Sequence, residues 1–128
     1  MVYLGRQVLA ELLECDKNRL NDLDYVKKAM VEAAIEANAT VVGYKFHKFA
    51  PQGVSGVVII AESHLAIHTW PEHGYAAVDI FTCGSKTEPK LALKHLRLAF
   101  RAKRVKYKEL ERGVVEDVAP SGHLVPDA

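Results

Sequence analysis

The chain has 128 residues, 49% of them hydrophobic, which is long enough for one domain with a real core but too short for two. The 17 basic and 16 acidic residues nearly cancel, so the basic surface typical of nucleic-acid binding is not expected. Residues 1–6 lack the features of a secretion signal, and no apolar run is long enough to span a bilayer. Two cysteines, Cys15 and Cys83, are too few for a disulfide framework and fit a reducing compartment. We therefore expect one cytoplasmic domain over residues 1–128, without a nucleic-acid or membrane partner.

The first half of the chain predicts a strand, a helix and a second strand. Residues 7–15 are mostly apolar, and we expect a strand there, although Leu and Ala are equally at home in helices. Asn21 and Asp22 offer capping side chains to a helix whose apolar residues recur at helical spacing as far as Asn38. Residues 41–49 read as a strand that the following Pro-Gln-Gly breaks.

The second half predicts further strands and one helix. Pro89, in the first turn after Thr87-Glu88, marks a helix start, and basic residues at 101–104 suit the negative end of the helix dipole. Residues 113–128 contain Gly and Pro and are expected to form a mobile tail. The expected strands are residues 54–61, 65–70, 75–83 and, at an edge of the sheet, 105–110.

This order of elements predicts an α+β fold, a two-layer sandwich of an antiparallel sheet with two helices on one face. The helices can cover only one face, and the strands around residue 60 are apolar on both. We therefore expect the other face to be buried, and a second copy of the chain is the simplest partner.

Chemistry-bearing residues gather between Gly53 and Gly84. Two strand-like segments meet at Glu62-Ser63 with no Gly, Pro or Asn between them, and the next strand ends in Cys83. A hydroxyl, an imidazole and a thiol therefore lie within about twenty residues of sequence.

The residues alone leave several interpretations of Ser63 open. Most serines at such junctions serve turns. A Ser-His-Asp hydrolase could use His68 and Asp79, but no Gly-x-Ser-x-Gly elbow surrounds Ser63. A metal site is not expected, because His64 and His68, four residues apart on a strand, have Cα atoms about 13 Å apart.

At these residues the sequence resembles the prokaryotic S-adenosylmethionine decarboxylases, small pyruvoyl enzymes of polyamine synthesis. The resemblance covers roughly residues 4–112, and the tail lies outside it. The matching motifs are Leu4-Gly5-Arg6, Gly53-Val54-Ser55-Gly56, the block from Glu62 to Glu72, and the block from Tyr75 to Gly84.

The resemblance implies that the chain cuts itself between Glu62 and Ser63. The Ser63 hydroxyl attacks the carbonyl carbon of Glu62, the resulting ester is eliminated, and residue 63 becomes a pyruvoyl group. Backbone strain at the junction would help, because a planar peptide resists such attack. By resemblance, His68 is the base and Ser55 the accessory hydroxyl, while His64 receives no role.

The pyruvoyl group derived from Ser63 would replace an external cofactor, withdrawing electrons as carbon dioxide leaves the substrate. The resemblance implies S-adenosylmethionine as the substrate, Cys83 as the proton donor, Glu72 on the ribose, and Phe49 and Leu65 beside the adenine. It also implies a homodimer of processed two-chain protomers. Two alternatives stay open, namely arginine as the substrate within the same enzyme family, and a non-catalytic dimeric domain that binds through its open sheet.

Overall fold

One antiparallel sheet of six strands organises the computed structural model, which describes residues 2–61 and 63–115. The order across the sheet is β2-β3-β4-β5-β1-β6. Three α-helices and one short 3-10 helix connect the strands. The strands are β1 (Tyr3–Leu13), β2 (Val41–Lys48), β3 (Val54–Ile60), β4 (Ser63–Trp70), β5 (Tyr75–Cys83) and β6 (Arg104–Val114), and the helices are α1 (Lys17–Leu20), α2 (Leu23–Glu36), η1 (Pro71–His73) and α3 (Pro89–Phe100).

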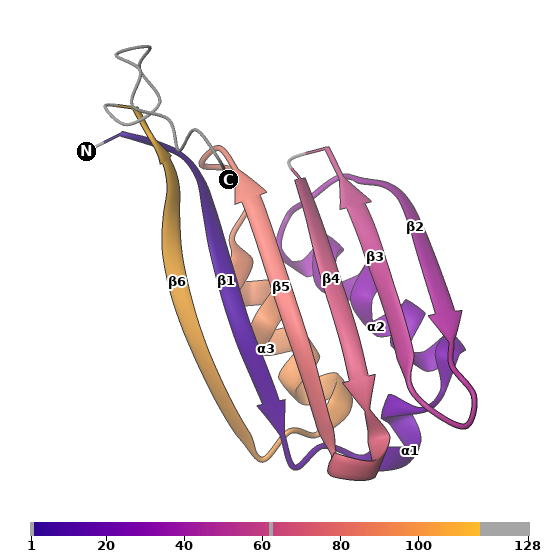
Figure 1. Ribbon diagram of the computed structural model, residues 1–128. Helices are drawn as coiled ribbons and strands as arrows, with labels where there is room; N and C mark the ends of the chain where they lie inside the picture. The colour runs from indigo at the N-terminus through magenta and orange to yellow at the C-terminus, as the bar shows by residue number, and fades with distance from the viewer. Residues whose placement is uncertain (1, 62, 116–128) are drawn as a thin grey trace, which may run out of the picture.

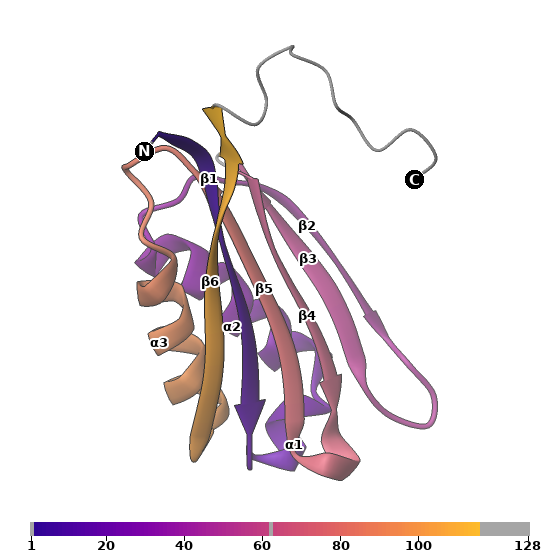
Figure 2. The same cartoon turned by 60° about the vertical axis from the view of Figure 1, so that its left-hand side comes forward.

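Both long helices pack on the same face of the sheet, as Figures 1 and 2 show. Alternate strand residues point toward the helices and are buried there. The largest side chains with less than 2% exposure in this core include Leu12, Leu65 and Ile80 from the strands, and Met30 and Phe100 from the helices. The predicted two-layer α+β architecture is confirmed.

Local signals account for the helix boundaries. The Asp22 carboxylate accepts a hydrogen bond from the Tyr25 N–H at 3.1 Å, which caps the start of α2 as predicted. Helix α3 begins at Pro89 and ends at Phe100, earlier than the basic residues at 101–104 suggested. The reason is Arg101, which adopts a left-handed conformation with φ of 54° and so stops the helix.

Two strand boundaries and one short helix also differ from expectation. Strand β1 begins at Tyr3 and pairs along its length with β6, so β6 continues to Val114 and includes the first residues assigned to the tail. The four-residue helix α1, capped by Asp16, was not predicted because one turn carries no periodic pattern. Residues 116–128 of the expected tail lie outside the described residues.

The sheet face opposite the helices has no covering layer within the described chain (Figure 2). Its central rows are the register pairs Ser55–His68, Val57–Ala66 and Ile59–His64 of β3 and β4. Ile59 is 49% exposed there, so this open face carries apolar side chains in contact with solvent. In the described ranges, the model has no helix long and apolar enough to cross a membrane.

Candidate active site

Ser63 is the first residue of β4 and has an unusual backbone. Its φ is 144°, a value that residues with a side chain rarely adopt and that costs on the order of 1–3 kcal/mol. Pairing holds it there from both sides, because Ser63 lies opposite Ile60 of β3 and Thr82 of β5. The strain expected at this junction is therefore present on the Ser63 side, while Glu62 lies outside the described residues.

The side chain that contacts Ser63 is His64. The Ser63 Oγ lies 3.2 Å from the His64 Nδ1, within hydrogen-bonding distance. The His64 ring in turn packs edge-on against Phe81, with centroids 5.7 Å apart. The sequence assigned His64 no role beyond a surface or structural one, and on a regular strand neighbouring residues such as Ser63 and His64 point to opposite faces. The irregular φ of Ser63, which the sequence does not show, removes that alternation.

Cys83 lies at the same end of the sheet as Ser63. It is the last residue of β5 and directly follows Thr82, the register partner of Ser63. Its thiol is free and exposed. The structure thus brings the predicted nucleophile and the predicted proton donor to the same end of the sheet.

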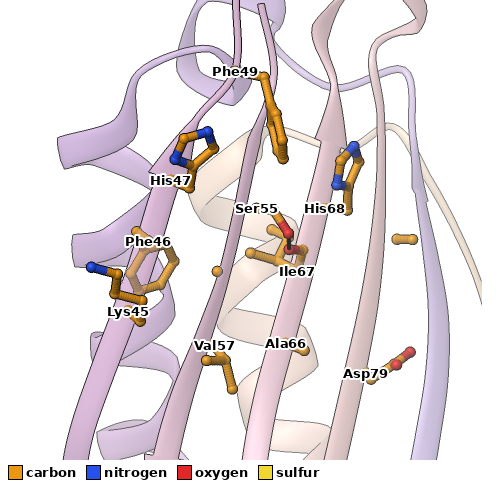
Figure 3. A pocket seen from close by; sticks show the side chains of 12 residues that line it. Lys45, Phe46, His47, Phe49, Ser55, Val57, Ala66, Ile67, His68 and Asp79 are labelled. Carbon is orange, nitrogen blue, oxygen red and sulfur yellow. Dashed lines mark hydrogen bonds between the residues drawn. The ribbon is translucent and has the colours of Figure 1, made fainter.

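A second group of predicted residues lies on the open face farther along β4. Ser55 and His68 are register partners, and the Ser55 hydroxyl donates to the Ile67 carbonyl at 3.4 Å. The Phe49 ring lies 5.5 Å from the His68 ring, and Figure 3 shows it between His47 and His68. These side chains line a shallow hollow of about 560 Å³.

The two groups are separated along the strand. His68 is five residues from Ser63 on β4, which at 3.3 Å per residue places their Cα atoms about 16 Å apart. Within one chain, the His68 imidazole therefore cannot reach the Ser63 backbone. The predicted catalytic set is divided into a Ser63 group, with His64 and Cys83, and a His68 group, with Ser55 and Phe49.

The remaining predicted binding residues have different surroundings. Glu72 is exposed in η1, just beyond Trp70 at the His68 end of β4. Leu65 has no exposed surface and points into the core toward the helices. The Leu65 side chain is turned away from the open face, because side chains alternate along β4, and the place of Leu65 beside the adenine stays a prediction.

Two aromatic rings and a carboxylate support the His68 group. The His68 ring lies 4.1 Å from Trp70, which stacks on Tyr75 with centroids 5.1 Å apart. The Tyr75 hydroxyl donates to the Glu11 carboxylate at 2.5 Å. Burial and this acidic partner raise the pKa of Tyr75 to about 12. Tyr75 therefore stays neutral at physiological pH, and its hydrogen bond to Glu11 holds the ring on which Trp70 stacks.

The second cysteine has a different environment. Cys15 is buried, and burial raises the pKa of its thiol to about 11. A thiol that stays protonated in an apolar site is a packing residue. Within residues 2–61 and 63–115, no group of three or more His, Cys, Asp or Glu side chains is placed to hold a metal ion.

These features define a class of protein: a small α+β domain with a strained serine and a free thiol at one end of an open sheet and an imidazole-lined hollow farther along it. Comparison with known proteins gives the family. The sequence model of the S-adenosylmethionine decarboxylase family matches residues 6–113. The chain belongs to the S-adenosylmethionine decarboxylase family, and the resemblance inferred from its motifs is confirmed.

Relatives match nearly the whole chain. The S-adenosylmethionine decarboxylase proenzyme of Pelotomaculum thermopropionicum is 56% identical over 91% of this chain and 93% of its own. The proenzyme of Acetivibrio thermocellus is 57% identical over 94% of this chain and 98% of its own. The crystal structure of the adenosylmethionine decarboxylase from Aquifex aeolicus superposes with a TM-score of 0.85 at 35% identity, covering 91% of this chain and 97% of that one.

Proposed function

We propose that the chain decarboxylates S-adenosylmethionine with a pyruvoyl group that it makes from its own Ser63. The decarboxylase activity rests on the family, since relatives above 50% identity over more than 90% of the chain carry that name. Their name, proenzyme, implies that they are made as precursors. The observation that carries the rest of the proposal is Ser63 itself, a strained serine with a bound imidazole at the first position of a strand.

Maturation begins with attack of the Ser63 Oγ on the carbonyl carbon of Glu62. The peptide bond becomes an ester, and loss of the α-proton of Ser63 then breaks the bond between its Cβ and Oγ. The chain ends at residue 62, and hydrolysis of the dehydroalanine at 63 leaves the pyruvoyl group. Opening the peptide releases the strain at Ser63, which favours the forward direction.

The His68 group would take part from a second copy of the chain. The open face carries exposed apolar side chains, and stacking two sheets by their faces buries such a surface. In a two-fold dimer, residues from opposite ends of one protomer can meet across the axis. A two-fold axis between the groups would place Ser55 and His68 of one protomer beside Ser63 of the other. His68 then removes the α-proton in trans.

The chain's own residues supply the rest of the site. The pyruvoyl group withdraws the electron pair that decarboxylation releases. Cys83, beside residue 63, returns a proton to the substrate carbon. Phe49 lines the hollow with an aromatic face suited to adenine or to the sulfonium cation, and the Glu72 carboxylate can accept two hydrogen bonds from a ribose diol.

Mass spectrometry under denaturing conditions tests the proposal. The matured protein gives fragments of residues 1–62 and 63–128, and phenylhydrazine adds to the second, whereas Ser63→Ala stays whole at 14.2 kDa. A wild-type chain that stays whole after long incubation supports instead the non-catalytic sheet domain. Carbon dioxide release from S-adenosylmethionine and from arginine, measured side by side, decides between the two substrates.

A further inference from the structure

The first step of maturation needs a base that the roles assigned so far do not provide. When the Ser63 Oγ attacks, its proton must leave, and the peptide nitrogen must receive a proton as the bond to residue 62 breaks. His68 removes a different proton, the one on the Ser63 Cα, in the later elimination. Its place about 16 Å along β4 keeps it from serving the hydroxyl of its own chain.

We propose that His64 is the general acid and base of the attack by Ser63. This inference rests on the proposed self-processing and adds a residue to it. The Nδ1 of His64 lies 3.2 Å from the Ser63 Oγ, and hydrogen-bonding reach is the first requirement of a general base. The contact needs the tautomer with its proton on Nε2, so that Nδ1 accepts from the hydroxyl.

The surroundings hold the ring in this position. His64 lies between Ile59 of β3 and Phe81 of β5, its register partners on the open face. Phe81 packs edge-on against the imidazole, and the Arg112 guanidinium covers Phe81 at 4.7 Å from the ring centroid. A ring held by its contact with Phe81 loses little conformational freedom when it takes part in the attack.

The step balances without any other reagent. The Ser63 Oγ forms a bond to the carbonyl carbon of residue 62 while its proton passes to His64 Nδ1. The bond from that carbon to the Ser63 nitrogen then breaks, and the imidazolium returns the proton to the nitrogen. The products are an ester at Oγ and a free amine on residue 63, with His64 neutral again.

Ester formation can be measured alone in the His68→Ala chain, in which the later elimination is blocked. Hydroxylamine cleaves the ester and releases residues 1–62, so fragments seen only after its addition report the first step. We expect His68→Ala, freshly made by cell-free synthesis, to form the ester. The double variant His64→Asn/His68→Ala should form it at least about 100-fold more slowly, the usual contribution of general acid–base catalysis.

A matched control is His95→Asn in the same background. His95 lies on α3, in the helix layer, with its Nε2 3.6 Å from a carboxylate oxygen of Glu32. This variant should form the ester at the rate of His68→Ala alone. Thermal unfolding of each variant shows whether the fold is intact, and added imidazole should restore ester formation to His64→Ala/His68→Ala.

Other outcomes separate this inference from the proposed function. A wild-type chain that never cuts itself refutes both. If the wild type matures while His64→Asn/His68→Ala forms the ester as fast as His68→Ala, His64 is not the base. Maturation of the wild type without any ester in His68→Ala also contradicts the inference, because an intact His64 should suffice for that step.

Discussion

At the scale of single residues, the sheet concentrates strain on the nucleophile. Ser63 is held in its unusual conformation by pairing with Ile60 and Thr82, and β4 continues that pairing on both sides to Ser55 and Tyr75. The cost of about 1–3 kcal/mol at one residue is less than the net stability of a folded domain, which is roughly 5–15 kcal/mol. Strain can therefore persist at the bond that must break without unfolding the protein.

Tyr75 offers a pH-dependent signature of the His68 group. In the unfolded chain the pKa of this hydroxyl is that of an ordinary tyrosine, about 10, whereas burial and Glu11 raise it to about 12 in the folded protein. A raised pKa means that the folded state holds the proton more tightly. The resulting stability is complete below pH 10 and is lost as the pH rises toward 12.

Tyrosinate absorbance, followed from pH 9 to pH 12.5, should show one late-titrating tyrosine that Tyr75→Phe removes. Glu11→Gln should move that titration to lower pH, because it removes the negative charge beside the hydroxyl. A late component that survives in Tyr75→Phe would contradict the assignment.

The two cysteines should differ sharply in reactivity. Cys83 is exposed, whereas burial of Cys15 raises the pKa of its thiol from 9.0 to about 11, which lowers its thiolate fraction about 100-fold at neutral pH. Iodoacetamide should therefore label Cys83 first in the folded protein, as peptide mass spectrometry can show. In urea the two rates should become similar. Preferential labelling of Cys15 in the folded state would show that this burial is wrong.

The place of Cys83 beside residue 63 gives a catalytic prediction. Cys83→Ala keeps Ser63, His64 and His68, so it should still cut itself. Its turnover of S-adenosylmethionine should fall by about 10²- to 10⁴-fold, because the released carbanion lacks its proton donor. Carbon dioxide release by the processed variant measures this, and normal turnover would remove Cys83 from the mechanism.

At the scale of elements, the hairpin of β2 and β3 depends on close contact between a ring and a glycine. Phe46 lies opposite Gly56, and a Cβ added at Gly56 would come within 2.0 Å of the Phe46 ring. The glycine in the Gly53-Val54-Ser55-Gly56 motif therefore makes room for the ring that covers it. Ser55, one residue earlier, is thereby held in register with His68.

We expect Gly56→Ala to lower the free energy of unfolding by about 1–3 kcal/mol, because the ring must move or the strands must separate. Urea unfolding measures this. Gly43→Ala on β2 is the matched control, since a Cβ there has no atom within 4 Å, and its effect should be small. Combining Gly56→Ala with Phe46→Leu should recover part of the loss, and strict additivity would argue against the contact.

Local sequence patterns were sufficient to predict most helices and strands, but not how the residues of the site are placed relative to one another. Alternation located the strands, and Asp22 and Pro89 located the helix starts, because those signals act within a few residues. The φ of Ser63 and its contact with His64 depend on pairing with two other strands, which no local window contains. The roughly 16 Å between Ser63 and His68 follows from strand geometry once β4 begins at Ser63, whereas the strand expected from the sequence began at residue 65.

At the scale of the whole molecule, the separation of the two groups supports the proposed dimer. A face with Ile59 and Phe49 at least 40% exposed is poorly suited to a monomer, and the proposed two-fold stacking would bury it and join the groups. The sequence predicted a dimer from the uncovered face and from the family resemblance. The geometry adds a reason that a single chain should be unable to complete its own maturation.

Mixing two inactive chains tests this directly. Neither Ser63→Ala nor His68→Ala alone should yield the pyruvoyl fragment. In a mixed dimer, however, one composite site contains Ser63 from the His68→Ala chain and His68 from the Ser63→Ala chain. After co-expression in equal amounts, about half of the His68→Ala chains should be cut, because random pairing gives half of them the complementary partner.

Distinct tags on the two chains let mass spectrometry identify which one is cut. Only the His68→Ala chain should be, since the other lacks the hydroxyl. Co-expression of His68→Ala with the double variant Ser63→Ala/His68→Ala is the control and should give no pyruvoyl fragment, because no protomer then supplies the imidazole. Native mass spectrometry that finds mixed dimers without cutting would show that His68 does not act across the interface.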